Sequence, residues 1–268
     1  MTAPVSLDFV PLVLVSTLLT GALSALAYRR SVLTWDGSLA AFVVGMVIGI
    51  FGDVTWLFLL LFFLLSSFLA TRYRFALKEA LGVQEGLRGE RKSTNVFANG
   101  FAPMAVAVIA LTMPTAFPKV ISGIIFLSAL SVAGADTLAS EIGVLSKKTV
   151  LITTRETVPP GTDGGVSRLG QLCAFGAAAY TSVAGWVVLS YVSRLWNLTV
   201  IPTMPEASWY LLIPMAIGFL GCQFDSVLGA TLERRGLMDK KTVNLVSTTS
   251  GAVLAYIILI AAGPLPTA

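Results

Sequence analysis

The stretch Val54–Thr71, VTWLFLLLFFLLSSFLAT, decides the fold of this chain, because it holds no charged residue over its whole length. Asp53 precedes it and Arg72 follows it, so charged residues stand at both ends of the apolar run. A bilayer core about 30 Å thick is crossed by roughly 20 apolar residues in a helix. This stretch is therefore predicted to cross a membrane as a single helix.

The same pattern recurs on both sides of this stretch. Gly52-Asp53 is typical of a tight turn, so the short run before it is predicted to be a separate span. The first run is not expected to be a secretory signal peptide, because Asp8 stands at its start and a basic pair follows it. We expect an all-α, polytopic transmembrane helical bundle of about eight spans, forming one integral membrane domain over residues 1–268. Besides Val54–Thr71, the expected spans are Phe9–Tyr28, Gly37–Gly52, Val96–Met113, Val120–Ala139, Leu169–Val192, Ser208–Ala230 and Thr242–Ala262.

The composition agrees with a membrane protein and narrows its chemistry. Of the 268 residues 56% are hydrophobic and 12% are charged, against about 25% charged in a soluble domain. The absence of histidine excludes Ser-His-Asp and Cys-His triads and His-ligated metals. Cys173 and Cys222 lie inside apolar runs, which gives neither a disulfide framework nor a Cys-type zinc site. Catalysis would therefore use carboxylates, amides, hydroxyls, Lys or Arg, and hard metal ions.

The basic residues predict how the chain is oriented in the membrane. With eight spans, sixteen of the eighteen Lys and Arg residues fall in alternate connections on one side. Connections rich in Lys and Arg face the cytoplasm, so both termini are expected outside. We expect a prokaryotic plasma membrane, with a thylakoid or plastid envelope as the alternative. A nucleic-acid partner is not expected, because no soluble basic domain exists to bind one.

Three carboxylates, those of Asp136, Glu141 and Asp225, lie near the cytoplasmic ends of their predicted spans. Ionisable residues at that depth are costly and are candidates for function. In a continuous helix Asp136 and Ser140 share one face, whereas Glu141 points elsewhere unless the helix breaks before it. The alternative is that these carboxylates pair with the lysines of the following loop. The hydroxyls expected to support them are those of Thr137, Ser140 and Ser226.

The loop at residues 153–168, TTRETVPPGTDGGVSR, is rich in glycine and leads into a span. Glycine permits positive φ, so that successive backbone N–H groups can converge on an anion. The start of the following helix adds its own free N–H groups. The alternative is an ordinary Pro-Gly turn. The residues expected to bind phosphate are Gly161, Thr162, Asp163, Gly164, Gly165, Ser167 and Arg168.

A third polar segment, RGERKSTNVFANG at residues 88–100, runs from a loop into a span. Its cations lie above its amides along one helical stripe, which suits a phosphate. The alternative is a positively charged cytoplasmic flank with two amides that hydrogen-bond between helices. The residues expected to act here are Arg88, Arg91, Lys92, Asn95 and Asn99.

All these groups fall on the predicted cytoplasmic edge. Carboxylate ligands without histidine or thiolate clusters favour Mg²⁺ over Zn²⁺. Sites of phosphoryl or nucleotidyl transfer combine Mg²⁺, Lys or Arg side chains and a loop that binds anions. We therefore expect Mg²⁺ on Asp136, Glu141 and Asp225, with Asn99 as a further catalytic residue.

Four motifs resemble one membrane family, which includes transmembrane protein 19 and the phytyl-phosphate kinase of the vitamin E pathway. The motifs are ADTLASEIG at 135–143, VPPGTDGGVS at 158–167, ANG at 98–100 and DSVLGA at 225–230. The resemblance extends over roughly residues 34–255 and implies a kinase. Its donor would be a nucleoside triphosphate, CTP in this family, and its acceptor phytyl or geranylgeranyl phosphate.

Two other functions are compatible with these residues. A CTP-dependent cytidylyltransferase that makes a CDP-lipid would need the same groups. A transporter of ions or phosphorylated metabolites is the alternative outside enzymes, although its carboxylates would lie near the middle of the bilayer. No stretch predicts the oligomeric state.

Overall fold

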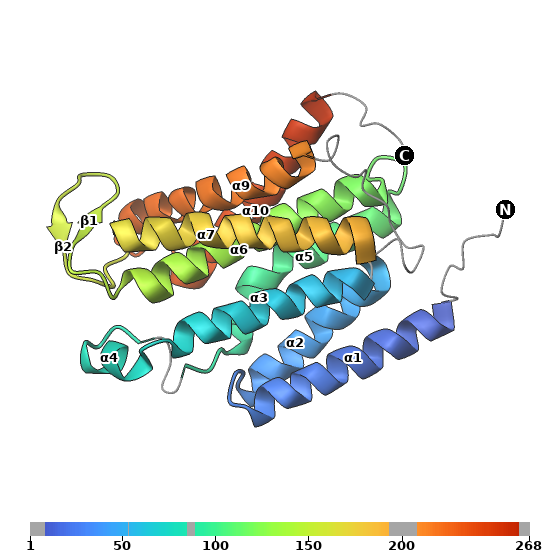
Figure 1. Ribbon diagram of the computed structural model, residues 1–268, viewed down its shortest axis with the longest axis horizontal. Helices are drawn as coiled ribbons and strands as arrows, with labels where there is room; N and C mark the ends of the chain where they lie inside the picture. Colours follow the sequence, from blue (N-terminus) through green and yellow to red (C-terminus); the bar gives the residue numbers. More distant parts are fainter. Residues whose placement is uncertain (1–8, 53, 85–88, 193–207, 263–268) are drawn as a thin grey trace.

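The computed structural model describes residues 9–52, 54–84, 89–192 and 208–262, and it is a bundle of long helices (Figure 1). Within these residues eight helices are long and apolar enough to cross a membrane, which confirms the predicted fold class. The helices are α1 (Phe9–Arg29), α2 (Trp35–Val47), α3 (Val54–Arg72), α4 (Phe75–Ala80), α5 (Ser93–Thr112), α6 (Lys119–Gly143), α7 (Arg168–Val187), α9 (Ser208–Leu228) and α10 (Lys240–Ala261). The π-helical turns η1 (Ile48–Gly52), η2 (Val188–Val192) and η3 (Gly229–Glu233) extend α2, α7 and α9.

Helix α6 is the centre of the bundle. It packs against α3, α5, α7, α9 and α10, and most of its residues are buried. Glycines of the neighbouring helices permit this close packing: a Cβ on Gly218 would lie 2.1 Å from Ser131 Oγ, and one on Gly221 would lie 2.4 Å from Val132 Cγ2. Small residues at helix contacts are the usual way to pack helices closely in lipid.

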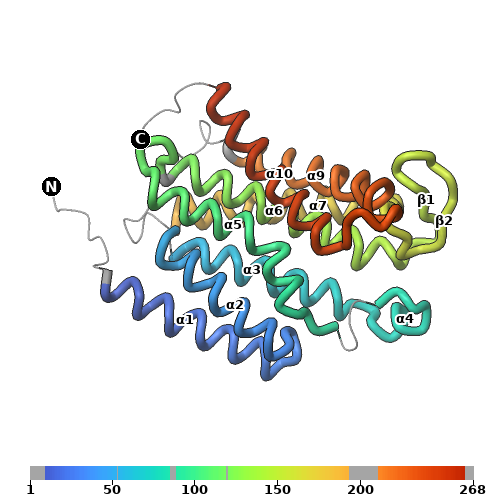
Figure 2. The backbone as a smooth tube through the Cα atoms, turned by 180° about the vertical axis from the view of Figure 1, so that it is seen from behind, coloured from blue at the N-terminus to red at the C-terminus, as the bar shows by residue number. Residues whose placement is uncertain are grey.

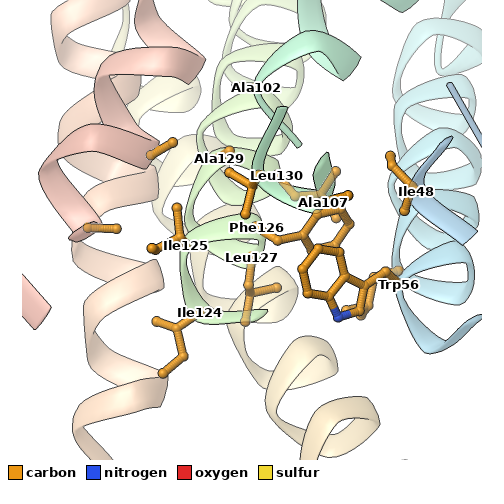
Figure 3. Packing of buried hydrophobic residues seen from close by; sticks show 14 of the residues in the cluster. Ile48, Trp56, Ala102, Ala107, Ile124, Ile125, Phe126, Leu127, Ala129 and Leu130 are labelled. Carbon is orange, nitrogen blue, oxygen red and sulfur yellow. The ribbon is translucent and has the colours of Figure 1, made fainter. Parts of the chain in front are cut away.

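The largest apolar cluster joins α6 to α2, α3 and α5 (Figure 3). Trp56 of α3 stacks on Phe126 of α6, with ring centroids 4.3 Å apart and an interplanar angle of 25°. Ile48 of η1 and Ala107 of α5 belong to the same cluster. This packing fixes α3 and α5 against α6.

Two helix boundaries differ from the expected spans in ways that bear on the site. Helix α5 begins at Ser93 rather than Val96, because the carboxylate of Asp36 accepts a hydrogen bond from Ser93 N at 2.9 Å and caps the helix. Helix α6 continues to Gly143 without a break after Ala139. Asp136 and Glu141 therefore lie on different faces of one helix.

A small antiparallel sheet and the short helix α4 were not among the expected elements. The sheet has the order β2-β1-β3 and consists of β1 (Thr149–Leu151), β2 (Thr157–Val158) and β3 (Gly165–Val166). It lies at the end of the bundle where α6 and α9 end and α7 and α10 begin (Figures 1 and 2). Helix α4 lies at the same end, so the connections after α1, α3, α6 and α9 all gather there.

Candidate functional site

A cavity of about 400 Å³ opens at this end of the bundle, between the ends of α6 and α9 and the starts of α7 and α10. The loop after β2 and the residues that follow α4 close its sides. Many of the candidate site residues that the sequence predicts line this cavity. These are Asp136, Ser140, Glu141, Gly161, Thr162, Asp163, Gly164, Gly165, Ser167, Asp225 and Ser226.

Asp136 of α6 and Asp225 of α9 line the cavity together, close enough for their carboxyl groups to interact. Ser247 of α10 donates a hydrogen bond of 2.8 Å to Asp225 Oδ2, which fixes the orientation of that carboxyl group. Two carboxylates so close repel each other unless a proton or a cation lies between them. The pair is therefore the part of the cavity best suited to hold a cation.

The donor set at this pair fits Mg²⁺. In phosphoryl-transfer sites Mg²⁺ is bound through one or two carboxylates together with substrate phosphates and water, rather than by a cage of protein ligands. Among the described residues no group of three or more His, Cys, Asp or Glu side chains is placed to hold a metal ion. The expected set of three carboxylate ligands stays a prediction, and Asp136 and Asp225 are the two of them that interact as a pair in the cavity.

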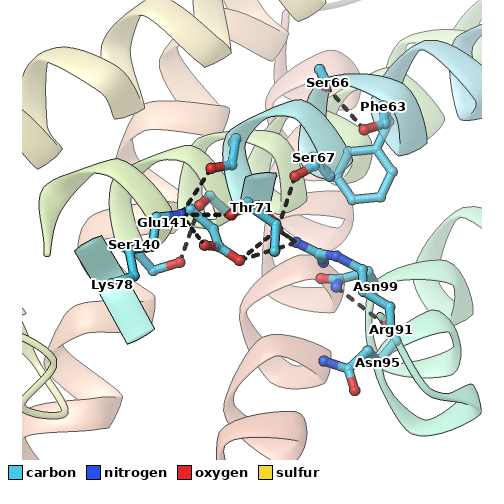
Figure 4. Close-up of polar contacts among 12 residues, drawn as sticks. Phe63, Ser66, Ser67, Thr71, Lys78, Arg91, Asn95, Asn99, Ser140 and Glu141 are labelled. Atoms are coloured by element: carbon cyan, nitrogen blue, oxygen red, sulfur yellow. Dashed lines mark hydrogen bonds and ion pairs between the residues drawn. The ribbon is translucent and has the colours of Figure 1, made fainter. Parts of the chain in front are cut away.

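Glu141 instead takes part in a separate buried ion pair (Figure 4). Its Oε2 accepts a hydrogen bond from Lys78 Nζ at 2.7 Å, and its Oε1 accepts one from Thr71 Oγ1 at 2.6 Å. Arg91 Nη2 lies 3.9 Å from the same Oε1. Because α6 is unbroken, Glu141 makes these contacts toward α3 and α4, while it also lines the cavity with Asp136. Its expected role as a metal ligand stays a prediction, which the ion pair with Lys78 disfavours.

Lys78 belongs to this network but was not among the residues expected at the site. Its side chain is fully buried, and its Nζ also donates to the carbonyl oxygens of Ala70 and Thr71, at 2.9 and 3.0 Å. These carbonyls belong to the last turn of α3, where no intrahelical donor remains. Lys78 therefore caps α3 and holds α4 against α6, which places residues 82–84 in the wall of the cavity.

The glycine-rich loop is held in place by close backbone contacts. Gly161 and Gly164 have φ of +84° and +71°, which disfavour other residues. A Cβ on Gly164 would lie 2.2 Å from Ala230 N, so the loop rests directly on the backbone of η3. The amides of Thr162 and Gly165 donate to Pro159 O and Thr162 O. These two amides therefore stabilise the loop itself and do not form part of an open anion nest.

Ser167 is likewise used by the fold. Its Oγ accepts a hydrogen bond from Gly170 N at 3.1 Å as the N-cap of α7, and donates one to Gly143 O at 3.1 Å. The hydroxyl thereby joins the end of α6 to the start of α7. The expected supporting hydroxyl of Thr137 is buried and does not line the cavity, whereas those of Ser140 and Ser226 belong to residues that do.

Among the residues that the structure describes, the expected phosphate-binding cations Arg91, Lys92 and Arg168 do not line the cavity. Arg168 lines a neighbouring apolar hollow, and Arg91 Nη2 lies near Glu141 Oε1 and Thr71 Oγ1. Lys92, Asn95 and Asn99 do not line the cavity; Asn99 Nδ2 donates to Asn95 O at 3.3 Å within α5. Arg88 lies outside the described residues.

Several residues that the sequence analysis did not name complete the cavity. Lys240 lies at its mouth, and Glu233 lines it near Asp163. Thr149 of β1 lines it with a buried hydroxyl that has no hydrogen-bond partner among the described residues. Five acidic residues (Asp136, Glu141, Asp163, Asp225 and Glu233) therefore face one basic residue among those described as lining the cavity.

Outside the spans, Asp239 caps the start of α10. Its carboxylate accepts hydrogen bonds from the backbone N and the Oγ1 of Thr242, at 2.8 and 2.7 Å. These bonds stabilise the charged form and hold the pKa of Asp239 below its usual value. The cap fixes the first turn of the helix that carries Lys240 and Ser247.

Residues 18–253 match the family described as "Integral membrane protein DUF92". The chain belongs to this family. It is 29% identical over 245 residues to an uncharacterized membrane protein of Methanocaldococcus jannaschii, which covers 91% of this chain and 93% of that protein. No solved structure matches it.

Two plant proteins are also similar. Protein PGR of Arabidopsis thaliana is 31% identical over 229 residues, which cover 78% of this chain and 75% of that protein. The chloroplastic protein VTE6 of the same plant is 27% identical over 232 residues, which cover 84% of this chain and 65% of that protein. The family that the four motifs resemble is thus confirmed, and the chain is an integral membrane protein.

Proposed function

We propose that the protein is a membrane kinase that transfers a phosphoryl group from a nucleoside triphosphate, CTP by preference, to phytyl or geranylgeranyl phosphate. The observation that carries the proposal is the Asp136–Asp225 pair inside a cavity at one end of the bundle. The substrates are inferred from the family that the motifs resemble, because that family includes the phytyl-phosphate kinase.

The excess of acidic groups explains how the cavity would choose its ligand. Glu141 is paired with Lys78, but Asp136, Asp163, Asp225 and Glu233 would still repel a bare triphosphate, whereas a triphosphate complexed with a divalent cation would be attracted to them. Asp136 and Asp225 would hold Mg²⁺, which neutralises charge on the phosphate oxygens during transfer. Ser247 keeps Asp225 oriented, and Lys240 adds a positive charge at the mouth of the cavity.

The remaining residues position the substrates. The acceptor is already an anionic phosphate, so its oxygen attacks without a strong general base, which agrees with the absence of histidine. The loop at 161–165 and the segment held by Lys78 meet at Gly161 and Val83 and together form part of the cavity wall. Catalysis then rests mainly on proximity and charge stabilisation.

The decisive experiment supplies the purified protein with geranylgeranyl or phytyl phosphate, Mg²⁺, and either CTP or ATP. Formation of the prenyl diphosphate with release of CDP or ADP supports the kinase. Release of pyrophosphate with a CDP-lipid product would identify the cytidylyltransferase instead. Flux of a phosphorylated solute into proteoliposomes without nucleotide turnover would identify a transporter.

Substitution of the carboxylate pair tests the site. Asp136→Asn and Asp225→Asn each remove a charge that holds the cation, and we expect turnover to fall roughly a hundredfold or more, since a bound metal contributes several kcal/mol. Glu79→Gln, at an exposed position on α4, is the control and should leave turnover unchanged. Full turnover in both Asp variants, each with a wild-type melting temperature, would remove the pair from the site.

A further inference from the structure

A second hollow, of about 580 Å³, lies beside the cavity between α7 and α9. Its walls are apolar: Leu172 and Phe175 come from α7, Phe219 from α9, and Val150 and Val166 from the sheet. The rings of Phe175 and Phe219 meet edge to face, with centroids 6.0 Å apart. We call this hollow the α7–α9 groove.

The α7–α9 groove adjoins the acidic cavity. Val166, Ser167 and Gln171 line both hollows, so a molecule in the groove would lie next to the cavity. Leu172 and Phe175 are 71% and 52% exposed, so the groove opens sideways to the surroundings of the spans, which in a membrane are lipid chains. The junction therefore suits an amphipathic molecule with a polar head and an apolar tail.

Arg168 gives the groove a charge at the end nearest the cavity. It is exposed, it is the first residue of α7, and it makes no ion pair with any residue that the structure describes. A guanidinium beside an apolar groove complements a phosphate attached to a hydrocarbon chain. A neutral lipid would gain nothing from this cation.

The groove is short. From Arg168 to Phe175 helix α7 advances roughly 10 Å at 1.5 Å per residue. An apolar chain that enters at Arg168 is therefore in contact with the groove over its first part and lies among the bilayer lipids beyond it. The protein would accordingly recognise the part of the tail next to the phosphate rather than its full length.

We propose that the α7–α9 groove binds the phosphate-proximal isoprene units of a prenyl monophosphate, with Arg168 in contact with the phosphate at the junction with the cavity. The inference rests on the proposed function, since the bound molecule is the acceptor. It assigns Arg168 to the lipid substrate and leaves the nucleotide to Asp136, Asp225 and Lys240. It also implies that chain length beyond the first units has little influence on binding.

Direct binding tests the groove without turnover. Geranylgeranyl monophosphate is titrated, with no nucleotide, into the protein in phosphatidylcholine nanodiscs. Arg168→Gln should weaken its binding about tenfold, as expected for the loss of a charge-assisted hydrogen bond, and Arg168→Lys less. Geranylgeraniol, which lacks the phosphate, should bind the wild type and Arg168→Gln equally.

The apolar wall has matched controls on the same helices. Leu172→Trp fills the groove and should weaken binding of the monophosphate severalfold. Val183→Trp on α7 and Leu220→Trp on α9 place the same side chain at lipid-exposed positions outside the groove and should have no effect. Monophosphates of increasing chain length should reach a constant affinity once the tail exceeds the groove.

The outcomes separate this inference from the proposed function. Binding that depends on Arg168 and Leu172 without formation of a diphosphate would uphold the groove and overturn the kinase. Formation of the diphosphate with unchanged binding and unchanged KM for the lipid in Arg168→Gln and Leu172→Trp would overturn the groove and uphold the kinase. Equal loss in the Val183→Trp and Leu220→Trp controls would also overturn it, because the effect would then be one of general lipid contact.

Discussion

At the scale of single residues, the buried network around Lys78 is the clearest case of a charge that the fold requires. The ammonium group has three hydrogen-bond donors, and the structure supplies three acceptors, on Ala70, Thr71 and Glu141 (Figure 4). A buried charge left without its partner is strongly destabilising, whereas replacing both partners by apolar residues often costs little. This asymmetry distinguishes a structural ion pair from a catalytic carboxylate.

Substitutions of this pair give the corresponding prediction. Lys78→Met leaves the buried Glu141 with the Thr71 hydroxyl and the more distant charge of Arg91, and we expect a loss of roughly 3–5 kcal/mol of stability, seen as a lower melting temperature in detergent. The double variant Lys78→Met/Glu141→Leu should recover much of that loss and retain turnover. If the double variant is stable but inactive, Glu141 has a role in the chemistry that its contacts do not indicate.

At the scale of elements, the glycine-rich loop and η3 form one unit of the cavity wall. Their backbones touch at Gly164 and Ala230, and Gly229 lies against the same point, since its Cβ would come within 2.8 Å of Gly164 N. The loop therefore depends on the exact course of the chain after Asp225. A substitution in the loop or in η3 should therefore disturb the Asp136–Asp225 pair through this contact.

Gly164→Ala tests this dependence. A methyl group there would meet the backbone of Ala230 at 2.2 Å, and φ of +71° adds about 1–2 kcal/mol of strain. We expect the loop to be displaced and turnover to fall about tenfold or more, with a lower melting temperature. Ala230→Gly should not rescue the variant, because the contact is with the backbone.

The matched control is Gly176→Ala on α7, where a methyl group would meet nothing within 4 Å. This helical position should tolerate alanine and even gain up to about 1 kcal/mol. Wild-type turnover in Gly164→Ala would show that the loop is not part of the working site, and a fall in both variants would show a general sensitivity to glycine replacement.

At the scale of the whole molecule, the sequence predicts the features that the surrounding lipid imposes, such as the spans. It does not predict contacts between residues that lie far apart in the chain. The spans are predictable because every backbone group in lipid must be satisfied within its own helix. Asp136 and Asp225 could be found because polar groups are costly in such helices. The position of Glu141 on another face follows from helical spacing.

Lys78, the small sheet and the place of Arg168 could not be predicted, because they depend on contacts that leave no local pattern in the sequence. Lys78 lies 63 residues from Glu141 in the chain, and nothing local marks it as buried. The strands of the sheet have two or three residues each, too few to show alternation. Arg168 was placed correctly beside the loop, but spacing alone could not tell that it lies in the α7–α9 groove rather than in the cavity.

The distribution of basic residues predicts how the bundle is oriented in the membrane. The cavity lies at the end of the bundle that carries most of these residues, so it should face the cytoplasm. In a variant with Cys173 and Cys222 replaced by alanine, Arg235→Cys marks this end and Thr115→Cys, in the connection between α5 and α6, marks the other; both positions are exposed. A membrane-impermeant maleimide should label Thr115→Cys in intact cells and Arg235→Cys only after permeabilisation. The reverse pattern would place the cavity outside, where cytoplasmic nucleotide cannot reach it, and would contradict the proposed kinase together with the orientation.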